Sequence, residues 1–138
     1  MSTSQHADRM NKQLGEMAAA VQAQDLDALL AFYDDDLVFI EGGTAMDKDG
    51  LADYLRELWA TQPDFSVELA ASHASDEVLA VTLAASTDAV TSAGETVKVH
   101  WPIFALYTFD LTTMKVVREL AFSDEEALAQ KFAALGVA

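Results

Sequence analysis

Four acidic side chains lie close together in the segment FYDDDLVFIEGG, residues 32–43. Asp34, Asp35 and Asp36 are consecutive, and Glu41 stands alone behind an apolar run. A hard cation needs several oxygens that converge within roughly 2.0–2.6 Å, whereas three consecutive side chains diverge. We therefore expect the aspartate triplet to form a solvated turn at the end of a helix, and we expect no metal site.

Glu41 is the first candidate for acid–base chemistry. It shares strand parity with Leu37 and Phe39, which should face the interior. A carboxyl group that is partly removed from water has a raised pKa, and it then works as a base nearer to neutral pH. The alternative is that the two glycines after Glu41 open the end of the strand, so that its side chain reaches water.

The helices that must position these residues are predicted from apolar residues at helical spacing. We expect a first helix over residues 5–23. A second is expected within QAQDLDALLAFY (22–33), with Asp25 as its N-cap and Tyr33 on its apolar side. A third is expected over residues 47–61, with Asp47 as its cap. Ser123 and Glu126 form a possible capping box for a last helix.

Strands are predicted where apolar residues alternate or form short runs. They are LVFIE (37–41), FSVELAAS (65–72), EVLAVTLAAS (77–86), residues 96–109 and KVVRELAF (115–122). The fourth is unusually long, which favours a bend or bulge, and Pro102 is a suitable place. Helices followed by a run of antiparallel strands indicate an α+β fold, in which a long curved sheet around the third helix leaves a pocket.

Composition excludes several classes of function. The 23 acidic and 8 basic residues give a net charge of −15, which argues against binding to nucleic acid and to anionic membranes. Without cysteine there is no disulfide or thiolate chemistry. No apolar stretch approaches the ~20 residues of a membrane span, and no secretory signal is visible. We expect one cytoplasmic domain over residues 1–138, with residues 1–7 frayed.

Three segments resemble the nuclear-transport-factor-2-like superfamily, and within it SnoaL-like polyketide cyclases and ketosteroid isomerases. They are AAAVQAQDLDALLAFYDDDLVFIEGG, MDKDGLADYLRELWATQPDFSVEL and GETVKVHWPIFALYTFDLTTMKVVREL. The resemblance implies a cone-shaped α+β fold with a mainly antiparallel sheet and an interior pocket. It also implies a small apolar ligand, polycyclic or polyketide-like, and no cofactor.

The resemblance assigns roles to some polar residues. In ketosteroid isomerase-like members an acid at the position of Glu41 moves a proton. Those members polarise the substrate carbonyl with two hydrogen-bond donors. The corresponding positions in this chain lie near Met17 and Ala105, and neither side chain donates a hydrogen bond. Tyr107 is a possible substitute, because it lies two residues from Ala105 on the same strand face. Steroid isomerisation by the usual arrangement is therefore not expected.

Two further glutamates are candidate partners of Glu41. In SnoaL-like proteins, polar residues near the last strand line the cavity, and Glu119 lies there. A Glu41–Glu119 pair divides acid and base roles if the two environments separate the pKa values; the alternative is a sheet-surface glutamate beside Arg118. Two acids in comparable places to Glu41 and Glu68 serve epoxide hydrolases of this fold, although strand parity favours an exposed Glu68.

Apolar side chains are candidate pocket walls or candidate interface residues. The expected substrate-binding residues are Phe39, Tyr54, Trp59, Trp101 and Ile103, together with Glu68; the alternative for the aromatic residues is plain core. On the opposite face of the long strand, His100, Phe104 and Leu106 suggest a partly apolar outer surface that would suit a homodimer.

The leading hypothesis is a cofactor-free acid–base enzyme of isomerase, cyclase, hydratase or epoxide-opening type, with Glu41, Glu119 and Tyr107 as its catalytic residues. The alternative is a non-catalytic ligand-binding or assembly domain of the same fold, which the apolar residues at Met17 and Ala105 favour.

Overall fold

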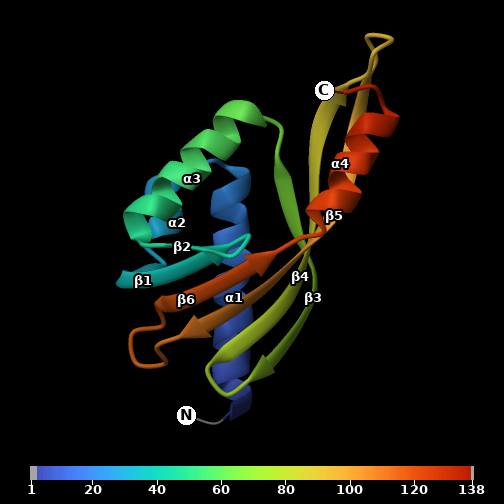
Figure 1. Cartoon of the computed structure of the whole chain (residues 1–138). Helices are drawn as coiled ribbons and strands as arrows, with labels where there is room; N and C mark the ends of the chain where they lie inside the picture. Colours follow the sequence, from blue (N-terminus) through green and yellow to red (C-terminus); the bar gives the residue numbers. More distant parts are fainter. Residues whose placement is uncertain (1–2, 138) are drawn as a thin grey trace.

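The computed structural model describes residues 3–137 as four helices and a six-stranded sheet, which confirms the α+β class (Figure 1). The helices are α1 (Thr3–Gln22), α2 (Leu26–Leu30), α3 (Lys48–Thr61) and α4 (Glu125–Ala134). The strands are β1 (Tyr33–Glu41), β2 (Thr44–Met46), β3 (Ser66–Ser75), β4 (Val78–Val90), β5 (Thr96–Phe109) and β6 (Val116–Phe122). Within the described range, no helix is long and apolar enough to cross a membrane.

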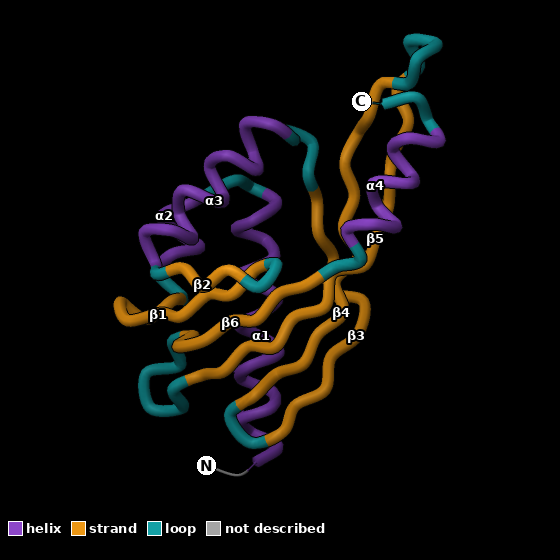
Figure 2. Tube along the Cα trace, in the orientation of Figure 1, coloured by secondary structure: helices purple, strands orange, loops and turns teal. Residues whose placement is uncertain are grey.

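The sheet has the order β2-β1-β6-β5-β4-β3, and the tube view shows its strong curvature (Figure 2). All neighbouring strands are antiparallel except β1 and β6, which run parallel. Their parallel pairing places the ends of both strands at one edge, with Glu41 opposite Ala121. Helix α1 crosses one face of the sheet, and the core forms there around fully buried Met10, Leu79 and Val116.

Strand β5 pairs with β4 along its whole length but with β6 only from Phe104 onwards. Its first half therefore projects with β4 as an arm, along which α4 lies (Figure 1). The arm is two-stranded only beyond Ser86, where β3 no longer pairs with β4. The expected bulge at Pro102 is wrong, because the register with β4 continues through Ala84 and Pro102. Pro102 lies beyond the reach of β6, where a missing N–H is tolerated. The irregularity lies between Thr108 and Phe109, opposite β6.

The aspartate triplet lies inside β1 and not in a turn, because α2 ends at Leu30 and β1 begins at Tyr33. Asp35 and Asp36 are exposed, as expected, and the pairing of β1 with β6 is irregular between Tyr33 and Val38. The Lys48 ammonium lies 3.2 Å from the Asp35 carboxylate. Among residues 3–137, no group of three or more His, Cys, Asp or Glu side chains is arranged to hold a metal ion.

The hairpin strand β2 was not predicted. Gly42 and Gly43 have φ values of 56° and 81°, which a two-residue type I′ turn requires at both positions. The turn folds β2 back on β1, so that Glu41 pairs with Thr44. The glycines therefore turn the chain tightly at the end of β1.

The helix ends test the capping predictions. Asp25 and Asp47 are N-caps, as expected, with carboxylates that accept hydrogen bonds from the Ala28 and Gly50 amides. The Ser123 capping box is wrong, because Asp124 caps α4 and accepts from the Ala127 amide at 2.9 Å. Helix α1 begins at Thr3, and residues 1–2 lie outside the described part of the chain.

Candidate active site

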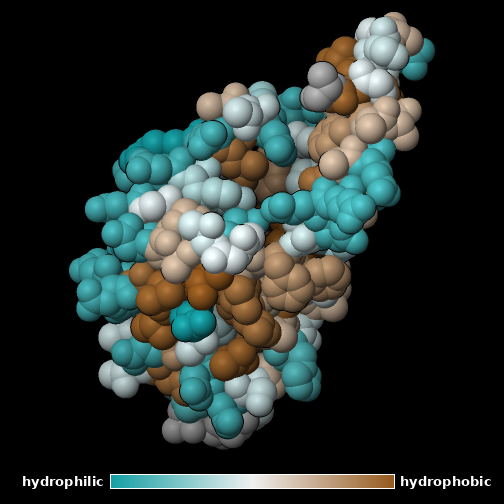
Figure 3. All heavy atoms as spheres, in the orientation of Figure 1, coloured by the Kyte–Doolittle hydropathy of each residue, from teal (hydrophilic) through white to brown (hydrophobic). Residues whose placement is uncertain are grey.

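Two adjoining chambers lie between the helices and the inner face of the sheet. The inner chamber has a volume of about 110 Å³ and the mouth about 290 Å³. Five residues line both, which makes them one continuous pocket: Glu41, Tyr54, Leu58, Phe65 and Ile103. The space-filling view shows the surface hollowed between α3 and α4, with apolar atoms inside the hollow (Figure 3).

Glu119 lies in the inner chamber on β6 and is only 7% exposed. Its register partners are Phe39 on β1 and Tyr107 on β5, so three neighbouring strands bring these side chains together. The Tyr33 hydroxyl donates a hydrogen bond of 2.5 Å to Glu119 Oε1. A sheet-surface position for Glu119 is thereby excluded.

Burial controls the protonation of Glu119. It raises the pKa of this carboxyl to about 7, the Tyr33 hydrogen bond acts in the opposite direction, and the charge of Glu41 raises it further. Desolvation penalises the ionised carboxylate, whereas a hydrogen bond to the carboxylate stabilises it. Glu119 therefore changes its charge near neutral pH, which is the property that a general acid needs.

Glu41 lies at the end of β1, where the hairpin turn positions it between the two chambers. It is half-buried, and its pKa is raised first by burial and then by the charge of Glu125. Glu125 belongs to the first turn of α4, beyond β6 in the chain. The two carboxyls thus have different environments: Glu119 is deeply buried and Glu41 is open to the mouth.

Three tyrosines supply neutral hydroxyls to the same pocket. Burial raises the pKa of Tyr54 to about 12 and holds the pKa values of Tyr33 and Tyr107 well above their ordinary value, so all three stay protonated at neutral pH. Tyr107 is 6% exposed. Among the residues that the structure describes, its hydroxyl has no hydrogen-bond partner. It is free to donate to a bound ligand.

Most of the expected wall residues line the pocket. Phe39, Tyr54 and Ile103 line the inner chamber, and Trp101 lines the mouth. Phe39 and Tyr54 are in contact, with ring centroids 5.7 Å apart. Ala105 also lines the inner chamber. In ketosteroid isomerase-like proteins a hydrogen-bond donor is expected near this position, and in this chain the side chain there is apolar.

Two expected binding residues lie elsewhere. Trp59 is packed in the hydrophobic core and lines neither chamber. Glu68 is exposed on β3, whose neighbouring Val67 takes the inward position. The structure does not bring Glu68 to Glu41, and the paired-acid alternative for these two residues is removed.

Tyr33 is the site residue that the sequence prediction missed. Helical spacing was extended through this residue, although the helix ends three positions earlier. Tyr33, Leu37, Phe39 and Glu41 are all odd-numbered, so in an extended strand they share one face. This alternation indicates that Tyr33 faces the interior with them.

The family model of the SnoaL-like domain matches residues 14–119. This chain belongs to the SnoaL-like domain family. Its six-stranded sheet and four helices over residues 3–137 are a variant of the nuclear-transport-factor-2-like fold, as the resemblance implied, with a sheet that does not close. The sequence matches no curated protein.

Solved structures show the same fold at low sequence identity. AclR, a putative hydroxylase from Streptomyces galilaeus, is 18% identical with a TM-score of 0.74, over 97% of this chain and 99% of that one. IdmH, a putative polyketide cyclase from Streptomyces antibioticus, is 14% identical with a TM-score of 0.77, over 90% and 98%. A putative SnoaL-like polyketide cyclase from Shewanella putrefaciens is 12% identical with a TM-score of 0.77, over 91% and 97%.

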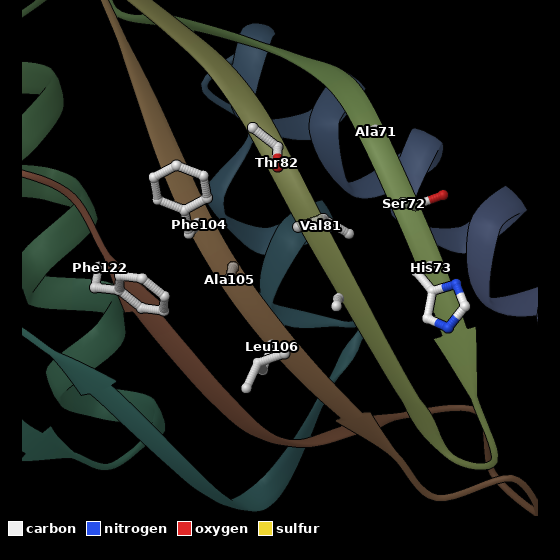
Figure 4. A pocket seen from close by; sticks show the side chains of 10 residues that line it. Ala71, Ser72, His73, Val81, Thr82, Phe104, Ala105, Leu106 and Phe122 are labelled. Carbon is white, nitrogen blue, oxygen red and sulfur yellow. The ribbon is translucent and has the colours of Figure 1, made fainter.

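The outer face of the sheet carries a separate apolar surface. A shallow groove of about 370 Å³ crosses β3, β4, β5 and β6 there, on the side away from α1 (Figure 4). Phe104 and Phe122 stack in it with centroids 5.6 Å apart, and Leu106 lies beside them. All three are 39–48% exposed. His100 is exposed on the same strand, in the arm beyond the groove.

Proposed function

We propose that this protein is a cofactor-free acid–base enzyme that acts on an apolar, polycyclic or polyketide-like small molecule. The observation that carries the proposal is a buried glutamate, Glu119, that changes its charge near neutral pH inside an apolar pocket. A second carboxyl, Glu41, lines the same pocket in a wetter environment. Two carboxyls whose environments separate their pKa values are suited to divide the roles of acid and base.

In the proposed mechanism Glu41 takes a proton from the ligand, and Glu119 gives a proton to a ligand oxygen. Tyr107 donates a hydrogen bond to the same oxygen, because it faces Glu119 across β5 and β6. Tyr33 holds the Glu119 carboxyl in position. In isomerisation or cyclisation, Glu41 returns its proton to a ligand carbon and Glu119 regains its proton from the ligand oxygen, so both carboxyls are restored and no reagent is consumed. In hydration or epoxide opening, Glu41 instead takes a proton from the water that adds to the ligand; the proton on Glu41 passes through solvent to Glu119, and one water is consumed.

Support for the apolar substrate comes from the lining of the inner chamber. Apart from the two carboxyls and three tyrosines, its lining side chains are apolar, which is typical of sites that orient a hydrophobic ligand with a few polar groups. Two of the similar structures are described as putative polyketide cyclases, which agrees with this substrate class.

Proton transfer can be tested without the natural substrate. We would incubate the protein with 2-tetralone in D₂O and follow deuterium entry beside the carbonyl by NMR. In parallel, 1,2-epoxytetralin would be tested for ring opening. Glu41→Gln is expected to slow the active reaction by about 10²-fold or more. Glu68→Gln, at an exposed carboxyl outside the pocket, is the matched control. A rate equal to the uncatalysed one with both probes, or full activity of Glu41→Gln, contradicts the proposal.

A second candidate function is ligand binding without turnover. The inner chamber of about 110 Å³ is small beside the ~300–1,000 Å³ of most ligand pockets, and the larger mouth is open. A probe that binds to the wild type and to Glu41→Gln with equal affinity, with no turnover by either, would favour this candidate.

We also propose that two copies associate through the outer face of the sheet. With a net charge of −15, two copies repel each other, and this repulsion is weakest when they meet through a surface without acidic side chains. Among the described residues that line the groove around Phe104, Leu106 and Phe122, there is no aspartate, glutamate, lysine or arginine. Exposed apolar patches of this kind are typical of interfaces.

A further inference from the structure

The side chains of the pocket that can carry charge near neutral pH are all carboxyls. They belong to Glu41, Glu119 and Glu125, and the hydroxyls of Tyr33, Tyr54 and Tyr107 beside them are neutral. Among the described residues that line the two chambers, there is no lysine, arginine or histidine. A ligand carboxylate or phosphate would therefore meet no positively charged side chain, whereas a cation would be attracted by the carboxylates of Glu41 and Glu125 at the mouth.

The mouth also offers hydrogen-bond acceptors that no protein group satisfies. The Gln62 Oε1 atom is buried at the mouth without a hydrogen-bond partner in the described part of the chain. The carboxylates of Glu41 and Glu125 line the same chamber and are not in any of the ion pairs between described residues. We call Glu41, Gln62 and Glu125 the mouth acceptors. An ammonium group, with its N–H donors and no acceptor, is complementary to them.

Aromatic rings complete the mouth. Phe65 and Trp101 pack against each other with ring centroids 5.9 Å apart, and Tyr54 lines the same chamber. The faces of such rings attract cations, and their area shields hydrocarbon from water. We call Tyr54, Phe65 and Trp101 the aromatic wall. A ligand that is both apolar and positively charged uses the wall and the mouth acceptors together.

Deeper in the pocket, an independent observation also indicates a ligand. Tyr107 is 6% exposed and lines the inner chamber, and within residues 3–137 its hydroxyl has no hydrogen-bond partner. A polar group of a bound ligand can therefore form a hydrogen bond with this hydroxyl away from bulk water. Both the mouth and the inner chamber therefore contain polar groups without a protein partner beside apolar walls. A ligand that carries polar hydrogens and apolar surface is complementary to both.

We propose that the pocket binds an apolar organic amine in its protonated form, with the nitrogen at the mouth acceptors and the hydrocarbon part against the aromatic wall. This inference deepens the proposed function, because it names the ligand class of the same pocket and rests on that pocket being the binding site. It requires that a compound of equal shape binds progressively more weakly as its charge changes from positive to neutral to negative.

Three compounds of one shape test the charge preference: 2-aminotetralin, 2-tetralol and tetralin-2-carboxylate. At about pH 7.5 the first is a cation and the last an anion. Isothermal titration calorimetry on the full chain is expected to show the amine binding about tenfold or more tighter than the alcohol, with the carboxylate weakest. The preference for the amine is expected to shrink at high salt, because part of it is electrostatic attraction over a distance.

Glu125→Gln tests whether the mouth provides the preference. Removal of this charge is expected to weaken amine binding by about threefold and to leave alcohol binding unchanged. The matched control is Glu126→Gln, the neighbouring exposed glutamate on α4, which does not line the mouth and should change neither affinity. Gln62→Leu, which removes the unpaired acceptor, should weaken the amine more than the alcohol.

The outcomes separate this inference from the proposed function. Equal affinities for the three compounds, tighter binding of the carboxylate, no binding of the amine, or equal effects of Glu125→Gln and Glu126→Gln overturn the amine assignment. Deuterium exchange of 2-tetralone or epoxide opening would still establish the acid–base function in that case. Tight amine binding without either reaction would instead support the ligand class and refute the catalytic role.

Discussion

Tyr33 donates a 2.5 Å hydrogen bond to Glu119 across the parallel β1–β6 pair, although 86 positions separate the two residues in the chain. The bond stabilises the carboxylate form of a group that burial pushes towards the neutral form. Because these influences oppose each other, small changes around Glu119 move its protonation across neutral pH.

Tyr33→Phe is expected to raise the pKa of Glu119 further above about 7, because it removes the hydrogen bond that favours the ionised form. The pH dependence of catalysis should move to higher pH, and the protein should lose about 1 kcal/mol of stability. NMR titration of ¹³C-labelled glutamate measures the pKa directly. Glu119→Gln identifies the resonance, and an unchanged or lower pKa in Tyr33→Phe contradicts the assigned hydrogen bond.

Glu119 should make the folded state less stable as the pH rises. Its folded pKa of about 7 lies above the ordinary value of 4.5, so the folded protein binds more protons than the unfolded chain between these two values. The contribution of this group therefore favours folding at low pH and falls by roughly 3 kcal/mol between about pH 4.5 and pH 7.

Urea denaturation of Glu119→Gln at several pH values measures this contribution. The difference in unfolding free energy between variant and wild type should move in favour of the variant as the pH rises through that window, and stay constant above about pH 8. Glu126→Gln, at an exposed carboxyl, is the control and should show a nearly constant difference. A constant difference for Glu119→Gln as well would contradict the raised pKa.

Gly42→Ala is expected to destabilise the protein by about 1 kcal/mol, because the residue has a φ of 56° in the left-handed region. Space is not the cause, since the added Cβ would lie 3.6 Å from Glu125 Oε1, an ordinary contact. Gly15→Ala in α1 is the contrasting variant: nothing lies within 4 Å of its Cβ, and it should gain roughly 0.5–1 kcal/mol. Thermal unfolding measures both, and equal signs would refute the turn assignment.

Phe104→Lys is expected to dissociate the proposed homodimer, because it places a charge beside Phe122 in the apolar groove. Analytical ultracentrifugation should show a dimer for the wild type and a monomer for the variant. Val90→Lys, at an exposed apolar residue at the end of the arm, is the control and should remain a dimer. A monomeric wild type would remove the proposed interface.

Local patterns were sufficient where a residue's role depends on its near neighbours in the chain. Alternation placed Leu37, Phe39 and Glu41 on the inner face of β1, and Asp25 and Asp47 were recognised as caps. These features depend on strand pleat and helix ends, which a few residues define. The bounds of β5 followed from its long alternating pattern for the same reason.

Contacts between segments that lie far apart in the chain could be identified only from the tertiary structure. Whether Glu119 is a surface or a buried group depended on its neighbours Phe39 and Tyr107, which other strands supply. The same holds for Trp59, which is core and not pocket wall, and for Tyr33, whose partner lies near the other end of the chain. The sequence by itself determined the types of the acidic and aromatic residues and the strand face of Glu41. Only the parallel pairing of β1 with β6 determined that two glutamates share one pocket, because desolvation and charge coupling act through space and not along the chain.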